Sequence, residues 1–332
     1  MADDRTPGGA GAAGRPGLRL EVAGGTATIR IDNPAKRNAM TVPMWRQLPV
    51  LLDRLAADPG VRVLVLTGAG DTFCAGADIG TLDELLGIRP MEGTGPVRAD
   101  GPAGDTGHGP AGGTEDGQAA MVVAENHLAA FPKPTIAEIR GHCVGGGCQL
   151  AVACDLRIAA EGTRFGVPPA RLGVVYPLPT TRRLVELVGP AAAKYLLYSA
   201  ELVDTAHATR IGLVDEVVPA DRLADRVRAL AATLADRSLL TQSAAKEYVA
   251  LASAARYDGG TDPGAGADRV AYWEREMRTA GDLTEGVAAF HERRPPIFSW
   301  SPHDADPAPG NPGRTPGEPG RTSGGPGQTP AG

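Results

Sequence analysis

The stretch "GHCVGGGCQLAVACDLRI", residues 141–158, sets three consecutive glycines directly before an apolar run of helical length. Glycine at the start of a helix costs conformational entropy, so the run Gly145, Gly146 and Gly147 indicates that the backbone itself is needed there. The first amides of a helix have no partner within that helix and lie at the positive end of its dipole. The stretch therefore predicts a helix start whose main-chain N–H groups serve a site.

A second junction of this kind follows the aliphatic run "VRVLVLTG" at 61–68. There "GAGDTFCAGADIGTLDELL", residues 68–86, places the small residues Ala75, Gly76 and Ala77 between a predicted strand and a predicted helix. Two helix starts that face each other can aim two backbone N–H groups at one oxygen, which makes an oxyanion hole. Taken alone, each motif fits phosphate binding or tight packing as well.

The rest of the chain alternates aliphatic runs with segments of helical periodicity, which is typical of an α/β protein. The runs predict a hairpin at 18–34 and strands at 61–68, 133–141 and 156–160. Helical spacing predicts helices at 40–58, with a kink at Pro49, at 146–154, at 180–202 and, capped by Asp204, within 204–219 before a further strand. The remaining sequence to about residue 290 is expected to be helical.

Three segments are too poor in apolar side chains to offset the entropy of ordering them. Residues 1–16 and 301–332 are predicted to be disordered tails, and Val, Ile, Leu, Met, Phe, Tyr and Trp are all absent from 302–332. Residues 88–118 are rich in Gly, Pro and Asp and are predicted to form a mobile loop.

Charge and cysteine content restrict the class of protein. The formal net charge of −6 argues against nucleic acid or an anionic membrane as the main partner. We find neither an apolar run of membrane-spanning length nor a signal-peptide pattern. The spacing of the four cysteines matches no zinc site, so reduced thiols in a cytoplasmic protein and no metal are expected: Cys74, Cys143, Cys148 and Cys154.

Several ordered motifs together resemble the crotonase superfamily, the enoyl-CoA hydratase/isomerase family. They are "IDNPAKRNAM", "GAGDTFCAGADI", "FPKPTIAEIRGHCVGGGCQLAVACDLRIAAEGTRFGVP", "ATRIGLVDEVVP" and "FHERRPPIF". The resemblance covers about residues 18–300 without the 88–118 loop. It implies a spiral core of repeated ββα units over 17–220 and a helical C-terminal region over 221–300 that assembles trimers, often as a dimer of trimers.

The resemblance also implies an acyl-CoA or carrier-bound thioester as substrate, with coenzyme A as part of the substrate and no separate cofactor. The amides of Ala77 and Gly146 would form the oxyanion hole that stabilises an enolate. The residues carried over to binding the thioester and the coenzyme A phosphates are Lys36, Arg37, Ala75, Gly76, Asp78, Ile79, Gly145 and Arg293.

Two positions leave the family's pattern. Hydratases of the family use two glutamates as general acid and base, and the matching positions here hold Gln149 and Pro169. Neither side chain can exchange a proton in the accessible pH range. Decarboxylation of a malonyl-type thioester needs no base, because loss of CO2 leaves the enolate directly. Tyr176 matches a tyrosine of the methylmalonyl-CoA decarboxylase branch, although that branch has histidine at the place of Ala77.

Three readings stay open from the sequence. The first is decarboxylation, with Tyr176 orienting the departing carboxylate and Gln149 contacting the substrate. The second is a hydratase, isomerase or C–C bond-forming enzyme whose acid–base group is Tyr176 or lies in the loop, at Asp100, Asp105 or His108. The third is a non-catalytic thioester-binding protein that keeps the fold for assembly.

Overall fold

The computed structural model describes residues 15–78, 80, 115–257 and 266–302. Its central sheet has six strands in the order β1-β2-β3-β4-β6-β8. The strands are β1 (Gly17–Ala23), β2 (Thr26–Asp32), β3 (Val63–Gly68), β4 (Thr135–Ile139), β6 (Leu156–Ala160) and β8 (Glu216–Val218). Only the β1–β2 pair is antiparallel; all the other neighbours are parallel.

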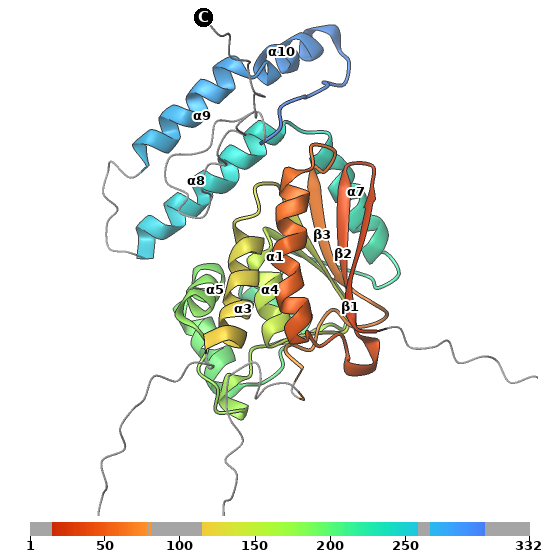
Figure 1. Ribbon diagram of the computed structural model, residues 1–332, viewed down its shortest axis with the longest axis vertical. Coiled ribbons are helices and arrows are strands. Elements are labelled where there is room, and N and C mark those ends of the chain that lie inside the picture. The colour runs from red at the N-terminus through yellow and green to blue at the C-terminus, as the bar shows by residue number, and fades with distance from the viewer. Residues whose placement is uncertain (1–14, 79, 81–114, 258–265, 303–332) are drawn as a thin grey trace, which may run out of the picture.

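Helices cover both faces of this sheet, as the alternation of side chains along β3 requires. Leu64 and Leu66 point into the main core, which α1 (Val42–Ala57), α3 (Glu115–Ala129) and α4 (Gly146–Ala153) complete. Val63 and Val65 point to the opposite face, where they meet α7 (Leu223–Ala235). Figure 1 shows α1 and α7 on opposite sides of β2 and β3. The α/β class predicted from the sequence is confirmed.

A second, two-stranded sheet joins the two glycine-bearing junctions. Strand β5 (His142–Val144) pairs in parallel with β7 (Arg164–Gly166). An isolated bridge links Cys74 to Cys143, and so ties the loop after β3 to β5. The sequence analysis missed this sheet, because strands of three residues are too short to show an apolar period.

Three helices differ from the predicted ranges. Helix α3 begins at Glu115, so the predicted loop 88–118 extends too far at its C-terminal end; residues 88–114 lie outside the described part. Helix α1 runs through Pro49 and ends at Ala57. The range 180–202 holds α5 (Leu178–Ser199), whose helical geometry is interrupted at Gly189. Asp204 caps α6 (Thr205–Arg210) as predicted, by accepting a hydrogen bond from the amide of His207.

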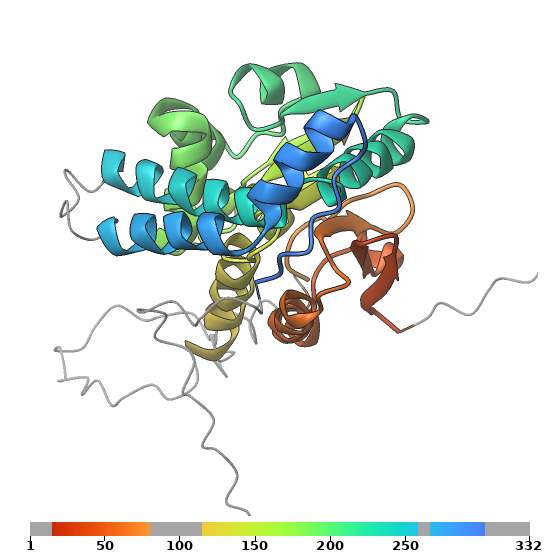
Figure 2. The same cartoon turned by 90° about the horizontal axis from the view of Figure 1, so that it is seen from above.

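The C-terminal region is helical, as expected: α8 (Leu239–Tyr257), α9 (Ala267–Thr279) and α10 (Asp282–Glu292). These helices form a layer at one end of the molecule (Figures 1 and 2). Their apolar side chains, among them Tyr272 and Trp273, make a separate small cluster with Trp300 from the segment after α10. Within the described ranges, we find no helix long and apolar enough to cross a membrane.

Candidate active site

The two glycine-bearing loops lie against each other through their backbones. The amide of Cys74 donates to the carbonyl of His142 at 3.0 Å, and the amide of Val144 donates to the carbonyl of Cys74 at 3.0 Å. A Cβ added to Gly76, which has a φ of +104°, would lie 3.0 Å from the Val144 oxygen and 3.3 Å from the Gly146 nitrogen. Gly76 is therefore required for the close approach of the first loop (residues 69–78) to the second loop (residues 144–147), which carries the Gly146 amide.

This arrangement leaves two amides without an internal acceptor. The residues on either side of Ala77 both bond to the backbone of Met40. The carbonyl of Gly76 accepts from the Met40 amide at 2.7 Å, and the amide of Asp78 donates to the Met40 carbonyl at 2.9 Å. The amide of Gly145 donates to Gly166 at 2.9 Å. Among the described residues, neither the Ala77 nor the Gly146 amide has an acceptor. Two unpaired N–H groups on adjoining loops are the elements of an oxyanion hole.

Polar side chains hold the first loop in place. Asn38 donates from Nδ2 to the carbonyls of Ala69 and Thr72, at 2.8 and 2.5 Å. The Lys36 ammonium binds the buried carboxylate of Asp78 at 2.6 Å. Lys36 therefore has an ion-pair partner at this loop, and the geometry gives it a positioning role beside the predicted contact with phosphate.

The other predicted thioester-binding residues are divided between the loop and a distant segment. Ala75 donates from its amide to the carbonyl of Arg37 at 3.0 Å, so both belong to the same loop assembly. Arg293 follows the last residue of α10, in the C-terminal layer, and no described contact joins it to the two loops. Ile79 lies outside the described residues.

The far wall of the second loop is built from α1 and α3. A Cβ on Gly146 would lie 3.1 Å from Cζ2 of Trp45 and 3.3 Å from Cε of Met121. The Trp45 ring is fully buried, and its Nε1–H has no acceptor among the described residues. A larger residue at Gly146 would press on this wall.

Tyr176, between β7 and α5, also reaches the second loop. A Cβ on Gly145 would lie 3.4 Å from the Tyr176 hydroxyl. Burial raises the pKa of the phenol above its usual value, and the nearby Cys148 and Glu125 raise it further. The hydroxyl therefore keeps its proton at neutral pH and is a hydrogen-bond donor next to the proposed oxyanion hole.

Gln149 lies one helical turn beyond Gly145 on α4, because its amide donates to the Gly145 carbonyl at 3.1 Å. The side chain is only 2% exposed, and neither Oε1 nor Nε2 has a partner in the described part of the chain. A buried amide without partners is costly, so the carboxamide is suited to meet a polar group of a substrate. Pro169 is buried in the short 3-10 helix Pro169–Arg171 that precedes Tyr176.

Glu125 is the site residue that the sequence analysis missed. It lies on α3, is 1% exposed, and accepts at Oε2 a hydrogen bond from Thr180 Oγ1 at 2.5 Å. Arg183 of α5 lies 3.4 Å from the same oxygen. Burial raises the pKa of Glu125 to about 7, while the Thr180 bond and the Arg183 charge act to lower it.

A signal for Glu125 was present in "MVVAENHLAAF", residues 121–131. Met121, Ala124 and Leu128 have the spacing of an apolar helix face, and Glu125 falls on that same face. A single acidic residue on an apolar helix face predicts a buried carboxylate.

The remaining chemical groups are accounted for by packing. All four cysteines are free and buried, and burial raises the pKa of Cys74 and of Cys154 to about 12. No cluster of three or more His, Cys, Asp or Glu suited to a metal occurs among the described residues. The carbonyl of His142 is part of the junction, as its bond from Cys74 shows.

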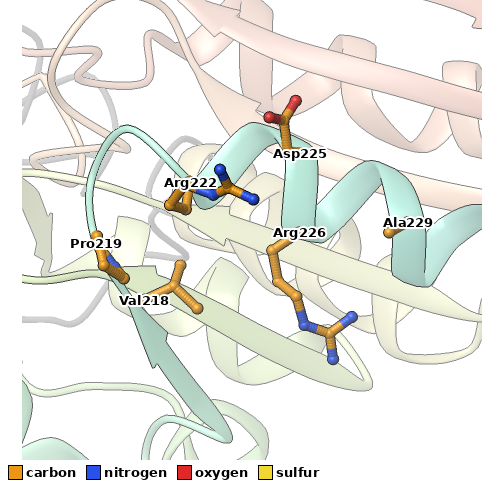
Figure 3. Close-up of a pocket in the computed structure, with 6 residues that line it drawn as sticks. All are labelled: Val218, Pro219, Arg222, Asp225, Arg226 and Ala229. Carbon is orange, nitrogen blue, oxygen red and sulfur yellow. The ribbon is translucent and has the colours of Figure 1, made fainter.

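A separate surface hollow lies between β8 and the start of α7 (Figure 3). It is lined by Val218, Pro219, Arg222, Asp225, Arg226 and Ala229. Arg226 forms an ion pair with Glu216, with Nη2 of the arginine 2.8 Å from Oε2 of the glutamate. None of the oxyanion-hole residues lines this hollow, so we place the candidate active site at the two loops.

Known proteins resemble this chain over most of its length. A family model described as enoyl-CoA hydratase/isomerase matches residues 21–87 and 111–301. A crotonyl-CoA hydratase of Syntrophomonas wolfei is 33% identical over 278 residues, which cover 82% of this chain and 94% of that protein. A 2,3-dehydroadipyl-CoA hydratase of Escherichia coli is 29% identical over 274 residues, covering 81% and 93%. A crystal structure of an enoyl-CoA hydratase/isomerase family member aligns with a TM-score of 0.71 at 36% identity, covering 86% of this chain and 99% of that one.

Proposed function

The chain belongs to the enoyl-CoA hydratase/isomerase family, and on that premise we propose that it decarboxylates a malonyl-type acyl-CoA thioester. The carbonyl oxygen of the thioester accepts hydrogen bonds from the Ala77 and Gly146 amides. These bonds strengthen as negative charge moves onto that oxygen, so they stabilise the enolate more than the bound substrate.

Decarboxylation is favoured by the residues at the two positions where hydratases of the family hold their acid and base glutamates. Gln149 carries no exchangeable acid proton and Pro169 has no functional side chain, so neither can remove a proton from carbon. In decarboxylation the electron pair of the breaking C–CO2 bond supplies the enolate, and CO2 leaves. The enolate carbon then takes up one proton, which gives the saturated thioester.

The observation that carries this proposal is the place of the Tyr176 hydroxyl beside Gly145. A protonated phenol at that position donates a hydrogen bond to the substrate carboxylate and sets the C–CO2 bond for cleavage. The neutral Gln149 carboxamide avoids the repulsion that a second carboxylate would exert on the substrate at low effective dielectric.

A second candidate function is hydration or isomerisation of an enoyl-CoA. Relatives of this chain are described as enoyl-CoA hydratases, and the buried Glu125 is a carboxylate that can exchange a proton near neutral pH. We propose no separate cofactor for either reaction. Assembly as a trimer or a dimer of trimers, with Arg293 at the coenzyme A phosphates, stays a proposal from the family resemblance.

Mass spectrometry after incubation with malonyl-, methylmalonyl- and enoyl-CoA esters separates loss of CO2 from gain of water. We expect CO2 release from a malonyl-type ester, and its absence with all of them would contradict the proposal. Gln149→Glu then discriminates further, with exposed Gln47→Glu as the control for added charge. The decarboxylase loses rate in Gln149→Glu, whereas a hydratase gains rate because one carboxylate is restored.

A further inference from the structure

We propose that Glu125 is the proton reservoir of this site and acts through the Tyr176 hydroxyl on the carbon next to the thioester carbonyl. The inference rests on the proposed enolate chemistry, because both decarboxylation and hydration deliver a proton to that carbon. Neither Gln149 nor Pro169 can deliver it, so the proton must come from another group.

The packing of α3 places Glu125 beside the oxyanion loops. A Cβ added to Gly146 would lie 3.3 Å from Cε of Met121. Glu125 follows Met121 by four residues and lies on the same face of α3. Thr180, which donates to Glu125, follows Tyr176 by four residues. Glu125 thus lies between the wall of the Gly146 loop and the segment that carries the Tyr176 hydroxyl.

The two carboxylate oxygens of Glu125 are used differently. Oε2 takes both the Thr180 hydrogen bond and the Arg183 contact. Oε1 takes neither of these two contacts, and so is the oxygen that we assign to carry the proton. Arg183 offers a positive charge to the carboxylate that remains after the proton has left.

The charged groups around Glu125 favour this exchange near neutral pH. From α5 and the segment before it, Arg183 and Tyr176 face Glu125, while Glu186 pairs with Arg182 at 2.8 Å. From α4, Cys148 acts on Tyr176. From α1, Asp53 approaches His127, which lies about 200° around α3 from Glu125. Burial outweighs the Thr180 bond and the Arg183 charge and sets the pKa of Glu125 to about 7.

The enolate carbon takes the phenolic proton of Tyr176. The phenol oxygen then takes a proton that comes from the Glu125 carboxylic acid through one solvent water, because Glu125 acts on Tyr176 through its charge and not through a direct hydrogen bond. Glu125 remains as a carboxylate beside Arg183 and regains a proton from solvent water. In the reverse direction, the Glu125 carboxylate removes a proton from the saturated thioester through the same hydroxyl.

Hydrogen exchange into propionyl-CoA in deuterated water tests this relay without requiring decarboxylation. We expect the wild-type protein to exchange the hydrogens next to the carbonyl, at a rate that rises with pH through about 7, since the reverse step needs ionised Glu125. Glu125→Gln and Tyr176→Phe should each slow the exchange by roughly 10²-fold or more. Glu247→Gln, a glutamate paired with Arg269 in the C-terminal layer, is the matched control and should leave the rate unchanged.

Two further variants separate proton transfer from a structural role. Thr180→Val and Arg183→Gln each remove a group that lowers the pKa of Glu125, so both should move the midpoint of the pH profile upward. A role limited to packing α3 against α5 would not move it.

Unchanged exchange in Glu125→Gln or in Tyr176→Phe overturns the relay, and so does wild-type protein that binds propionyl-CoA without exchanging it. Failure of the proposed function has a different signature: exchange is intact and depends on Glu125, while no malonyl-type ester releases CO2.

Discussion

The three tryptophans show how differently the active-site wall and the C-terminal layer are built. In the C-terminal layer, Trp273 donates from Nε1 to Glu247 at 2.8 Å and Trp300 donates to Glu276 at 3.0 Å. In the wall behind Gly146, Trp45 is more deeply buried, yet its Nε1–H has no acceptor among the described residues. Both indole N–H groups of the C-terminal layer thus have acceptors, as expected of a region that contributes mainly to stability. The indole N–H group in the wall behind Gly146 has none among the described residues.

The same contrast holds for two glutamates, the partly buried Glu247 and the fully buried Glu125. Glu247 accepts hydrogen bonds from Arg269 and Trp273, and although burial acts to raise its pKa, these bonds lower it overall. Glu125 has a hydrogen bond from Thr180 and the Arg183 guanidinium 3.4 Å away, but burial prevails and raises its pKa. A carboxylate that keeps a proton to neutral pH costs stability when it ionises, and such costs concentrate at functional sites.

The largest effect is expected at the Gly146 amide. Gly146→Pro removes the N–H group at the first position of α4, where proline is compatible with a helix. If that amide stabilises the enolate, turnover should fall by roughly 10²–10³-fold. Gly146→Ala keeps the amide and adds a Cβ at the Trp45 wall, so it is the control for crowding. If steady-state kinetics gave both variants the same rate, the assignment of the Gly146 amide to the oxyanion hole would be wrong.

Gly147→Ala tests how tightly the two loops are joined. A Cβ at this position would lie 2.4 Å from the carbonyl oxygen of Cys74, a backbone atom that cannot move aside by itself, and 2.7 Å from the Cβ of that residue. The free energy of unfolding should fall by about 3 kcal/mol. Urea denaturation measures it, and a loss below about 1 kcal/mol would mean that the loops adjust freely.

Glu125→Gln and Glu247→Gln should change stability with opposite signs. The folded-state pKa of Glu125 is raised from 4.5 to about 7, so its contribution to stability is full below about 4.5 and is lost as the pH rises through 7. At pH 8 the glutamine variant should therefore be more stable than the wild type, by up to about 3 kcal/mol. The pKa of Glu247 is lowered, so its contribution is present at neutral pH and Glu247→Gln loses it. Denaturation at pH 5 and pH 8 tests this, and equal pH dependence in the two variants would contradict it.

The smallest effect is expected at Gly286, within α10. A Cβ there would lie 3.6 Å from the Phe298 ring, an ordinary contact distance. Gly286→Ala should stabilise the protein by about 0.5–1 kcal/mol through helix propensity. Thermal unfolding gives the sign, and a destabilised variant would show that this layer is packed as tightly as the loops around Gly147.

The sequence predicted the parts of the fold that depend on neighbours along the chain. The aliphatic run at 61–68 became β3, residues 156–160 became β6 as predicted, and the glycine run supplied the N-cap and the first residues of α4. The prediction of amides without partners at Ala77 and Gly146 also rests on local geometry, because helix starts and tight loops leave such groups unpaired. Composition likewise set apart the tails and the 88–118 segment, although the tails apart from 15–16 and 301–302, and residues 88–114, lie outside the described part.

Only the tertiary structure decided which distant groups meet. Lys36 and Asp78 are 42 residues apart, and Glu125 and Thr180 are 55 residues apart. Residue type and spacing did not indicate that Lys36 would bind Asp78, or that Glu125 would lie beside Tyr176. The physical reason is that periodicity reports which face of an element is buried, whereas ion pairs and shifted pKa values depend on what the opposing element presents there. The sequence therefore determined where the backbone amides are free, and the packing of α3 against α5 decided which carboxylate lies near them.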